Sequence, residues 1–306
     1  MAADVARYSS LVAAANLPGL DILTASEQGS ARQRVADRNI ILGEPSMVAE
    51  VLDQARALEW VQSSWAGVDS LCRPDLRRDY VLTGVKDIFG PLISEYVMAY
   101  LFAFERRLFS MRSNQLQRHW KPLPYRSSKE ITLGIVGLGS IGASLAGKAS
   151  QFGIRVIGLN RSGKPCEGVE RVYTPGNLGG FFEDPDYIVL TLPDTPRTTH
   201  FISADTLTLM KPSAVLMNVG RGSLVNEADL VVALRDGVIG GAVLDVFEEE
   251  PLARDSALWQ LPNVFITPHT AAMSFPEDIV GIFIENYKRF IHRQGLSYII
   301  DFELGY

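Results

Sequence analysis

Residues 131–142 read ITLGIVGLGSIG, and this stretch decides the fold class of the chain. Its apolar run predicts a buried β-strand, and its glycines predict a tight turn that opens a helix. Gly137 permits the turn, Gly139 lets a pyrophosphate approach the backbone, and Gly142 lets the helix pack against the strand. The N–H groups and the positive dipole at the start of that helix would then bind the phosphates of a dinucleotide.

The segments after this turn repeat the same pattern. Further short apolar runs are RVIGLNR, YIVLTLP, AVLMNVGRG, GGAVLDVF and VFITPHT, and helical patterns lie between several of them. Strands that are apolar on both faces and alternate with helices indicate a parallel sheet covered on both sides. We therefore predict an α/β fold with a Rossmann-type doubly wound parallel sheet, a dinucleotide-binding domain made of residues 93–274.

The N-terminal part of the chain predicts a second, smaller α/β unit. Its predicted strands are LDILTA at 20–25, NIILG at 39–43 and WVQSSWAG at 60–67. Residues 45–58 predict a helix, and an amphipathic helix after Pro276 is expected to return to this unit. We therefore predict a discontinuous, flavodoxin-like substrate domain of residues 1–92 and 275–306, with a cleft between the two domains.

Composition limits the classes of function. The 306 residues carry 29 basic and 35 acidic side chains, a net charge of −6, with 47% apolar residues and no basic cluster. We expect a globular protein that binds no nucleic acid. The longest apolar stretch, 96–104, is too short to span a membrane. Cys72 and Cys166 fit neither a disulfide framework nor a metal site, and the chain lacks a secretory signal, so we expect a cytoplasmic protein without bound metal.

The residues after the next predicted strand bear on the choice of cofactor. A carboxylate about 20 positions after the glycine turn usually binds the ribose hydroxyls of NAD. Here the sequence reads Asn160-Arg161-Ser162, with Lys164 close behind. Loss of the negative charge and gain of cationic donors favour a 2′-phosphate, so we predict a preference for NADP(H). NAD(H) stays possible if Arg161 only stacks on adenine.

Three strand ends carry polar residues suited to chemistry. Arg221 stands between Gly220 and Gly222, Glu250 precedes a proline, and His269 follows one. Ligands of open parallel sheets bind beyond the carboxyl ends of the strands. There an arginine can clamp a carboxylate and a carbonyl, while a histidine beside a carboxylate can deliver a proton. This set suits reduction of a 2-keto acid, although Arg221 taken alone could be an ordinary surface residue.

Taken together, the motifs resemble the D-isomer-specific 2-hydroxyacid dehydrogenase family. They are SSWAGVDSL, GIVGLGSIG, LTLPDTPRTTHFI, LMNVGRGSLVNEADL, GAVLDVFEEEPL and LWQLPNVFITPHTAA, from about residue 60 onward. The resemblance implies that Arg221 binds substrate, that His269 is the acid/base, and that Glu250 pairs with it. The sequence departs from the family pattern at its start, because the family begins with an apolar strand and residues 1–15, MAADVARYSSLVAAA, contain none.

The resemblance implies further contacts. Backbone N–H groups of Ala66 and Gly67 would hold the substrate carboxylate, and Asp245 would orient the nicotinamide carboxamide. Trp65 would form an apolar wall beside a small substrate, with core filling as the alternative. We place the remaining cofactor contacts at Ser140, Ile141, Leu192, Pro193 and Val219.

The motifs SSWAGVD, FGPLISEY and LNRSGK are most similar to the glyoxylate/hydroxypyruvate reductase branch. The resemblance implies an NAD(P)-dependent enzyme that reduces a small 2-keto acid to the D-2-hydroxy acid. A dehydrogenase for bulkier 2-keto acids or phosphoglycerate, and a nucleotide-sensing, corepressor-like binding protein, are the alternatives. The long helix from Pro91 and the connector after it resemble the family's dimerisation arm, so we expect a homodimer.

Overall fold

A computed structural model describes residues 2–305 of the chain. The chain divides into two compact units, each described here by itself. Unit 1 consists of Met1–Ile88 and Ser274–Tyr306, and unit 2 of Phe89–Met273. Unit 1 is therefore built from two segments that are distant in the sequence.

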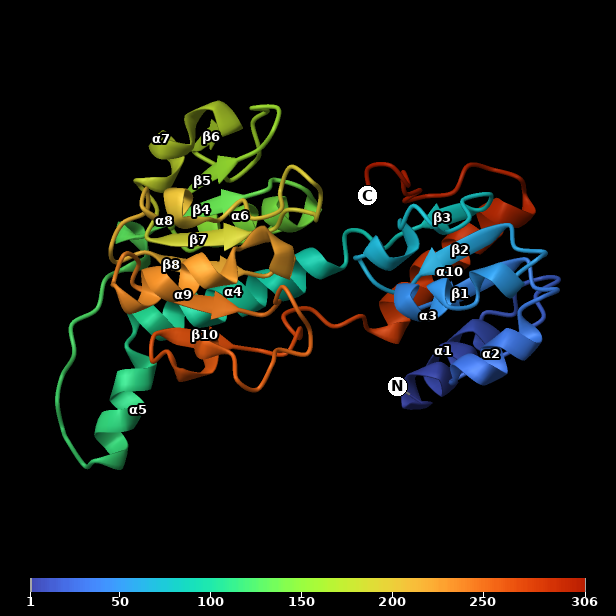
Figure 1. The fold of residues 1–306 in the computed structure, drawn as a ribbon, viewed down its shortest axis with the longest axis horizontal. Coiled ribbons are helices and arrows are strands. Elements are labelled where there is room, and N and C mark those ends of the chain that lie inside the picture. Colours follow the sequence, from blue (N-terminus) through green and yellow to red (C-terminus); the bar gives the residue numbers. More distant parts are fainter. Residues whose placement is uncertain (1, 306) are drawn as a thin grey trace. The chain divides into compact units, whose positions relative to one another are not determined.

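Unit 2 contains a seven-stranded, wholly parallel sheet with the order β6-β5-β4-β7-β8-β9-β10 (Figure 1). The strands are β4 (Thr132–Val136), β5 (Arg155–Leu159), β6 (Arg171–Tyr173), β7 (Tyr187–Leu190), β8 (Val215–Asn218), β9 (Gly241–Leu244) and β10 (Val264–Ile266). The chain reverses its direction of strand addition between β4 and β7, as in doubly wound dinucleotide-binding sheets. The predicted fold class is confirmed, and β6 is a strand that the sequence analysis did not identify.

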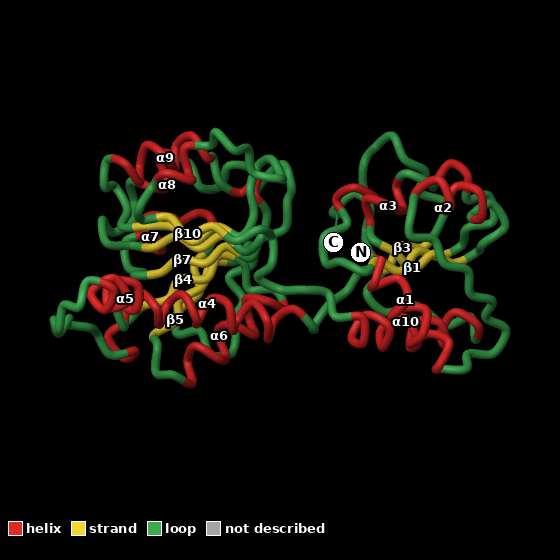
Figure 2. Tube along the Cα trace, turned by 90° about the horizontal axis from the view of Figure 1, so that it is seen from below, coloured by secondary structure: helices red, strands yellow, loops and turns green. Residues whose placement is uncertain are grey.

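Helices cover both faces of this sheet, with α8 and α9 on one face and α4 and α6 on the other (Figure 2). The helices are α4 (Phe89–Glu105), α5 (Leu108–Leu116), α6 (Ser140–Gln151), α7 (Leu178–Phe182), α8 (Ala204–Leu207) and α9 (Glu227–Arg235). Every residue of β4, β7, β8 and β9 is buried. The coverage on both faces explains why these strands are apolar without alternation.

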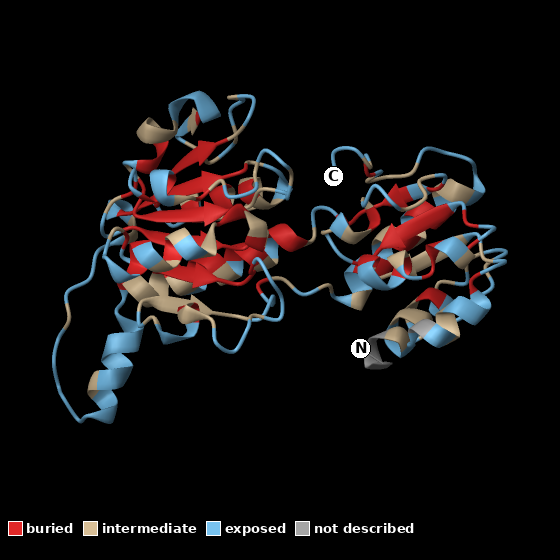
Figure 3. Cartoon of the chain, viewed as in Figure 1, coloured by how far each residue is buried: buried red, intermediate tan, exposed pale blue. Residues whose placement is uncertain are grey.

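The helix α5 differs from the others because none of its residues is buried (Figure 3). The chain turns into it at Arg107, which has a left-handed φ of 54°. Residues 112–130, RSNQLQRHWKPLPYRSSKE, are polar and contain prolines, which predicts a surface connector, but residues 112–116 form the end of α5. Beyond it, Trp120 is 99% exposed.

Unit 1 contains a three-stranded parallel sheet with the order β1-β2-β3. Its elements are α1 (Ala2–Ala14), α2 (Gln28–Arg34), β1 (Ile40–Gly43), α3 (Pro45–Ala49), β2 (Trp60–Ser63), β3 (Val81–Thr83) and α10 (Pro276–Ile291). The helices α1 and α10 lie on one face of the sheet, and α2 and α3 lie on the other (Figure 2). Phe283 of α10 stacks on Trp60 of β2 with ring centroids 5.3 Å apart, so the C-terminal helix shares the core of the N-terminal sheet.

Two predictions for unit 1 are wrong. Residues 20–25 form no strand, because Leu20 and Ile22 pack on the cluster around α10 instead of pairing with a neighbouring strand. The helix predicted over 45–58 is divided into α3 and a 3₁₀ turn, Leu52–Gln54. Two short helical turns bury the same apolar face that one long helix would bury, so the residue spacing did not reveal the break.

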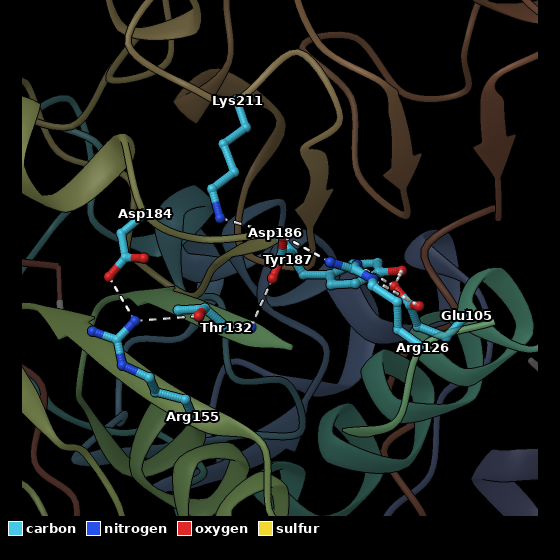
Figure 4. Close-up of polar contacts among 8 residues, drawn as sticks. All are labelled: Glu105, Arg126, Thr132, Arg155, Asp184, Asp186, Tyr187 and Lys211. Atoms are coloured by element: carbon cyan, nitrogen blue, oxygen red, sulfur yellow. Dashed lines mark hydrogen bonds and ion pairs between the residues drawn. The ribbon is translucent and has the colours of Figure 1, made fainter. Parts of the chain in front are cut away.

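A polar cluster lies at the amino ends of the strands of the large sheet (Figure 4). The glycine turn follows the carboxyl end of β4, at the other end of the strands. Asp186, directly before β7, accepts hydrogen bonds from the Thr132 backbone N–H at 2.8 Å, from Arg126 at 3.1 Å and from Lys211 at 3.3 Å. Arg126 also forms an ion pair with Glu105 at the end of α4. The cluster thereby ties the segment after α5 to the sheet.

These contacts lower the pKa of Asp186. Burial alone raises it, but the Thr132 N–H and the charges of Arg126 and Lys211 outweigh burial, and the pKa lies below its usual value of 3.8. A folded-state pKa below the unfolded one means that the ionised carboxylate stabilises the fold above about pH 4. That contribution is lost as the pH falls through the folded-state pKa.

We expect Asp186→Asn to lower the free energy of unfolding by about 2 kcal/mol at pH 7, because charged donors lose their acceptor. The difference in the free energy of unfolding between wild type and variant should become smaller as the pH is lowered from 6 to 3. Urea denaturation at each pH measures it. Glu170→Gln is the control, since Glu170 pairs with Arg155 in an exposed ion pair and should change stability by less than about 1 kcal/mol. A difference in the free energy of unfolding that does not vary with pH would contradict a stabilising role of the ionised Asp186 carboxylate.

Candidate active site

The glycine turn after β4 has the geometry that its sequence requires. Gly137 has a φ of 102°, which favours glycine, and its carbonyl accepts a 2.7 Å hydrogen bond from the Thr191 hydroxyl. A Cβ on Gly142 would lie 2.0 Å from the Gly137 carbonyl oxygen, so α6 can pack this closely only with glycine there. A Cβ on Gly139 would meet no atom within 4 Å, and no side chain caps the helix that begins at Ser140.

This turn fits a phosphate group. The space beside Gly139 is open, and the first N–H groups of a 12-residue helix face it without a side-chain cap. The other predicted cofactor contacts follow the carboxyl ends of neighbouring strands of the same sheet. They are Ile141, half-buried Leu192, exposed Pro193 and buried Val219. Their contact with a cofactor stays a prediction.

Asn160 shapes the loop after β5. Its Oδ1 accepts hydrogen bonds from the backbone N–H groups of Ser162 at 3.1 Å and Gly163 at 2.6 Å. Its Nδ2 donates to the Lys164 carbonyl at 3.0 Å, which an aspartate at this position could not do. The amide is therefore used inside the loop, while the side chains of Arg161 and Ser162 are exposed.

Glu250 and His269 form the central contact of the site. Glu250 Oε2 lies 2.8 Å from Nδ1 of His269, and Oε1 accepts a 3.0 Å hydrogen bond from the Phe247 backbone N–H. A carboxylate can only accept, so Nδ1 carries the proton in this pair. Nε2 is then the ring nitrogen that would exchange a proton with a ligand. Both carboxylate oxygens are bonded, so the pair has a fixed orientation.

Asp245 holds the loop that carries His269. It is 2% exposed, and its carboxylate accepts hydrogen bonds from the backbone N–H groups of Thr270 at 2.8 Å and Ala271 at 2.9 Å and from the Thr267 hydroxyl at 2.5 Å. Its carbonyl accepts the His269 N–H at 2.8 Å. These bonds keep His269 at a left-handed φ of 54°. The predicted contact between Asp245 and the nicotinamide stays a prediction.

Arg221 lies on the loop between β8 and α9, next to the loop of Glu250. A Cβ on Gly222 would lie 1.8 Å from the carbonyl carbon of Phe247, so the two loops touch backbone to backbone. Arg221 itself is half-buried and donates a 2.7 Å hydrogen bond to the Gly220 carbonyl. The structure therefore joins Glu250 to His269 directly and brings the loop of Arg221 against the loop of Glu250.

Several supporting residues were missed by the sequence analysis. Thr191 fixes the glycine turn, and Glu227 accepts the Glu248 N–H at 2.8 Å, which fastens the loop before Glu250. Tyr96 on α4 bonds the Thr267 hydroxyl at 2.7 Å, and burial raises the pKa of its phenol. Thr191 stands in the quoted LTLP motif, whereas nothing in the sequence connects Tyr96 with a loop 171 residues away.

The three residues predicted to bind substrate from unit 1 lie on the loop after β2. Trp65 is 41% exposed, which excludes the core-filling alternative, and Ala66 is exposed as well. Over residues 2–305 the backbone N–H groups of Ala66 and Gly67 donate no hydrogen bond to the chain. They have the properties of N–H groups that can bind a carboxylate.

Two kinds of feature are absent from the residues that the structure describes. No helix between residues 2 and 305 has the length and apolar character needed to cross a membrane. Within the same range, no three His, Cys, Asp or Glu side chains are grouped so that they could hold a metal ion.

The fold and the site define an α/β dinucleotide-binding protein with a hydrogen-bonded carboxylate–histidine pair at its strand ends. The family model described as "D-isomer specific 2-hydroxyacid dehydrogenase, NAD binding domain" matches residues 98–271. The chain belongs to this family of oxidoreductases, as the sequence motifs predicted. Its similarities support the glyoxylate/hydroxypyruvate reductase A branch.

Individual relatives match over most of the chain. Glyoxylate/hydroxypyruvate reductase A of Klebsiella pneumoniae is 32% identical and covers 83% of each protein. A D-isomer specific 2-hydroxyacid dehydrogenase family protein from Aeromonas salmonicida is 46% identical, with a TM-score of 0.94 over 98% of this chain and 96% of that one. The NADPH-dependent glyoxylate/hydroxypyruvate reductase of Sinorhizobium meliloti, solved with NADP and sulfate, is 29% identical, with a TM-score of 0.88 over 99% and 97%.

Two glycines of α6 allow a matched test of the turn. Gly142→Ala should weaken NADPH binding at least ten-fold and lower the melting temperature, because its Cβ would overlap the Gly137 carbonyl. Gly147→Ala has open space and should leave binding unchanged while stabilising α6 by about 0.5–1 kcal/mol. Fluorescence titration and thermal unfolding measure both. Equal effects of the two substitutions would contradict the packing argument.

Proposed function

We propose that this protein reduces a small 2-keto acid, of the glyoxylate or hydroxypyruvate type, to the D-2-hydroxy acid with NADPH. The observation that carries the proposal is the 2.8 Å contact between Glu250 and His269, on loops that follow adjacent strands beside the loop of Arg221. A proton donor held by a carboxylate, next to a guanidinium, suits a ketone that carries a carboxylate neighbour. The names of the relatives support the same substrate class.

In this proposal each residue has one task. Arg221 binds the substrate carboxylate and polarises the carbonyl, and the N–H groups of Ala66 and Gly67 bind the carboxylate further. His269 gives the proton on Nε2 to the carbonyl oxygen, while Glu250 stabilises the charged ring. The bound nicotinamide supplies the hydride. Trp65 limits the space for the substituent on the keto acid.

The test of this function uses variants of the acid/base pair. His269→Ala should lower kcat with glyoxylate by about 10²–10⁴-fold, the range for loss of a general acid, while NADPH binding is retained. Glu250→Gln should lower kcat less, because hydrogen bonding persists after the charge is removed. The adjacent, exposed Glu249 provides the control, and Glu249→Gln should act within two-fold of wild type.

The assay follows NADPH absorbance with a panel of 2-keto acids. Glyoxylate and hydroxypyruvate should be reduced faster than branched or phosphorylated 2-keto acids. A preference for the larger acids would assign another substrate within the family. NADPH binding without turnover of any acid would favour a nucleotide-sensing protein, and a near-normal rate in His269→Ala would remove that residue from its role.

The preference for NADPH forms a second part of the proposal. Arg161 and Lys164 bring positive charge to residues 160–164, which include no carboxylate, and the side chain of Asn160 is hydrogen-bonded within this stretch. The 2′-phosphate would bind to Arg161 and Ser162. Structural relatives solved with NADP or NADPH support this choice.

Arg161→Ala should raise the Kd of NADPH about ten-fold, the loss of one charge-assisted contact, and change the Kd of NADH less than two-fold. Isothermal titration with both nucleotides measures the ratio. Arg171→Ala is the control. Arg171 begins β6, so it lies at the amino ends of the strands, whereas Arg161 follows the carboxyl end of β5, and Arg171 packs on Tyr173. Tighter binding of NADH than of NADPH by the wild type would contradict the preference.

We also propose that the protein is a homodimer in the cytoplasm. The segment from α5 to residue 125 exposes large apolar side chains, which a second copy would cover. They are Leu108, Phe109, Met111, Leu116, Trp120 and Tyr125. The resemblance of this segment to a dimerisation arm supports the first part, and the two unpaired cysteines support the second.

A further inference from the structure

Unit 1 contains a buried hydrogen-bond network between its sheet and its C-terminal helix. Gln62 on β2 and Asn286 on α10 are both 0% exposed. Gln62 Oε1 accepts hydrogen bonds from Asn286 Nδ2 at 3.1 Å and from the Thr83 hydroxyl at 2.9 Å. Buried amides are costly unless bonded in this way, so their side chains have a single orientation.

Asn286 is held from its other side by the C-terminal segment. Its Oδ1 accepts the Ser297 backbone N–H at 2.8 Å, and its Nδ2 donates to the Ser297 carbonyl at 3.1 Å. That segment continues along β3, where the Gly84 N–H donates to the Tyr298 carbonyl at 2.9 Å. Asn286 therefore joins α10, the C-terminal segment and β2 through one side chain.

Gln62 connects Asn286 to the end of β2 through further hydrogen bonds. Its Nε2 donates to the Ser63 carbonyl at 3.0 Å and to the Gly84 carbonyl at 2.9 Å. The Ser63 hydroxyl in turn donates to the Trp65 carbonyl at 2.7 Å and accepts the Trp65 N–H at 3.0 Å. The contacts thus form one continuous series from Asn286 to Trp65.

The last contact sets the direction of a backbone donor. The Trp65 carbonyl and the Ala66 N–H belong to one peptide plane and point in opposite directions across a trans bond. Because the Trp65 oxygen faces the Ser63 hydroxyl, the Ala66 N–H points away from that hydroxyl. That N–H and the N–H of Gly67 donate no hydrogen bond within residues 2–305.

We propose that Gln62, Ser63 and Asn286 are positioning residues that preorient the Ala66 and Gly67 N–H groups to bind a carboxylate. The inference rests on the proposed function, since that function supplies the carboxylate. Preoriented donors bind a ligand without the entropy cost of ordering the loop first. Loss of the network should therefore weaken substrate binding while the proton-donating pair on unit 2 remains intact.

Two variants and a matched control test the proposal. Ser63→Ala removes the hold on Trp65 directly, and Asn286→Leu removes the link to α10. Each should raise KM for glyoxylate about ten-fold, with kcat and KM for NADPH within about three-fold of wild type. Tyr287→Phe, the next position on α10, deletes only the 2.9 Å bond to the Pro18 carbonyl and should leave KM for glyoxylate unchanged.

Hydrogen–deuterium exchange gives a readout that needs no turnover. The Ser64 and Trp65 amides, bonded to Gly43 and Ser63, should exchange at least ten-fold faster in Ser63→Ala and Asn286→Leu than in Tyr287→Phe. Unchanged exchange and unchanged KM in both variants would overturn the positioning role. If the two variants exchange faster but the wild-type protein reduces no 2-keto acid, the proposed function is refuted. The effect of the network on the loop would still hold.

Discussion

The contact between Glu250 and His269 depends on how closely the loops at the carboxyl edge of the large sheet approach one another. Gly222 allows the loop after β8 to touch Phe247, and the Phe247 N–H in turn fixes one oxygen of Glu250. The carboxylate of Asp245 accepts hydrogen bonds from backbone N–H groups of the loop that carries His269. Three adjacent parallel strands thus present their ends together, because every one of these strands runs in the same direction.

At the amino ends of the same strands, charged side chains stabilise the fold. Around Asp186, carboxylates and cations form ion pairs that tie a peripheral segment to the strands. At the carboxyl ends of the strands, the side chains of His269 and Glu250 are each over a third exposed. One edge is therefore organised for stability and the other for exchange with a ligand.

The sequence predicted those features that depend on a residue type at a fixed place along a strand. Gly137 and Gly142 were identifiable because a turn and a close helix packing demand glycine, and His269 because it ends an apolar run. The strand expected at 20–25 and the helix expected over 45–58 were wrong, since apolar spacing does not show whether a neighbour pairs with a segment or merely packs on it. Asp245 was named only because the family resemblance implies it, and its bonds to the loop join residues that only the fold brings together.

The backbone contact at Gly222 also limits how this scaffold could diversify. Any side chain at that position would have to displace Phe247 by more than an ångström, and with it the carboxylate that orients the histidine. Libraries aimed at new substrates should therefore leave position 222 invariant and vary the exposed loop of unit 1. There Trp65 is 41% exposed.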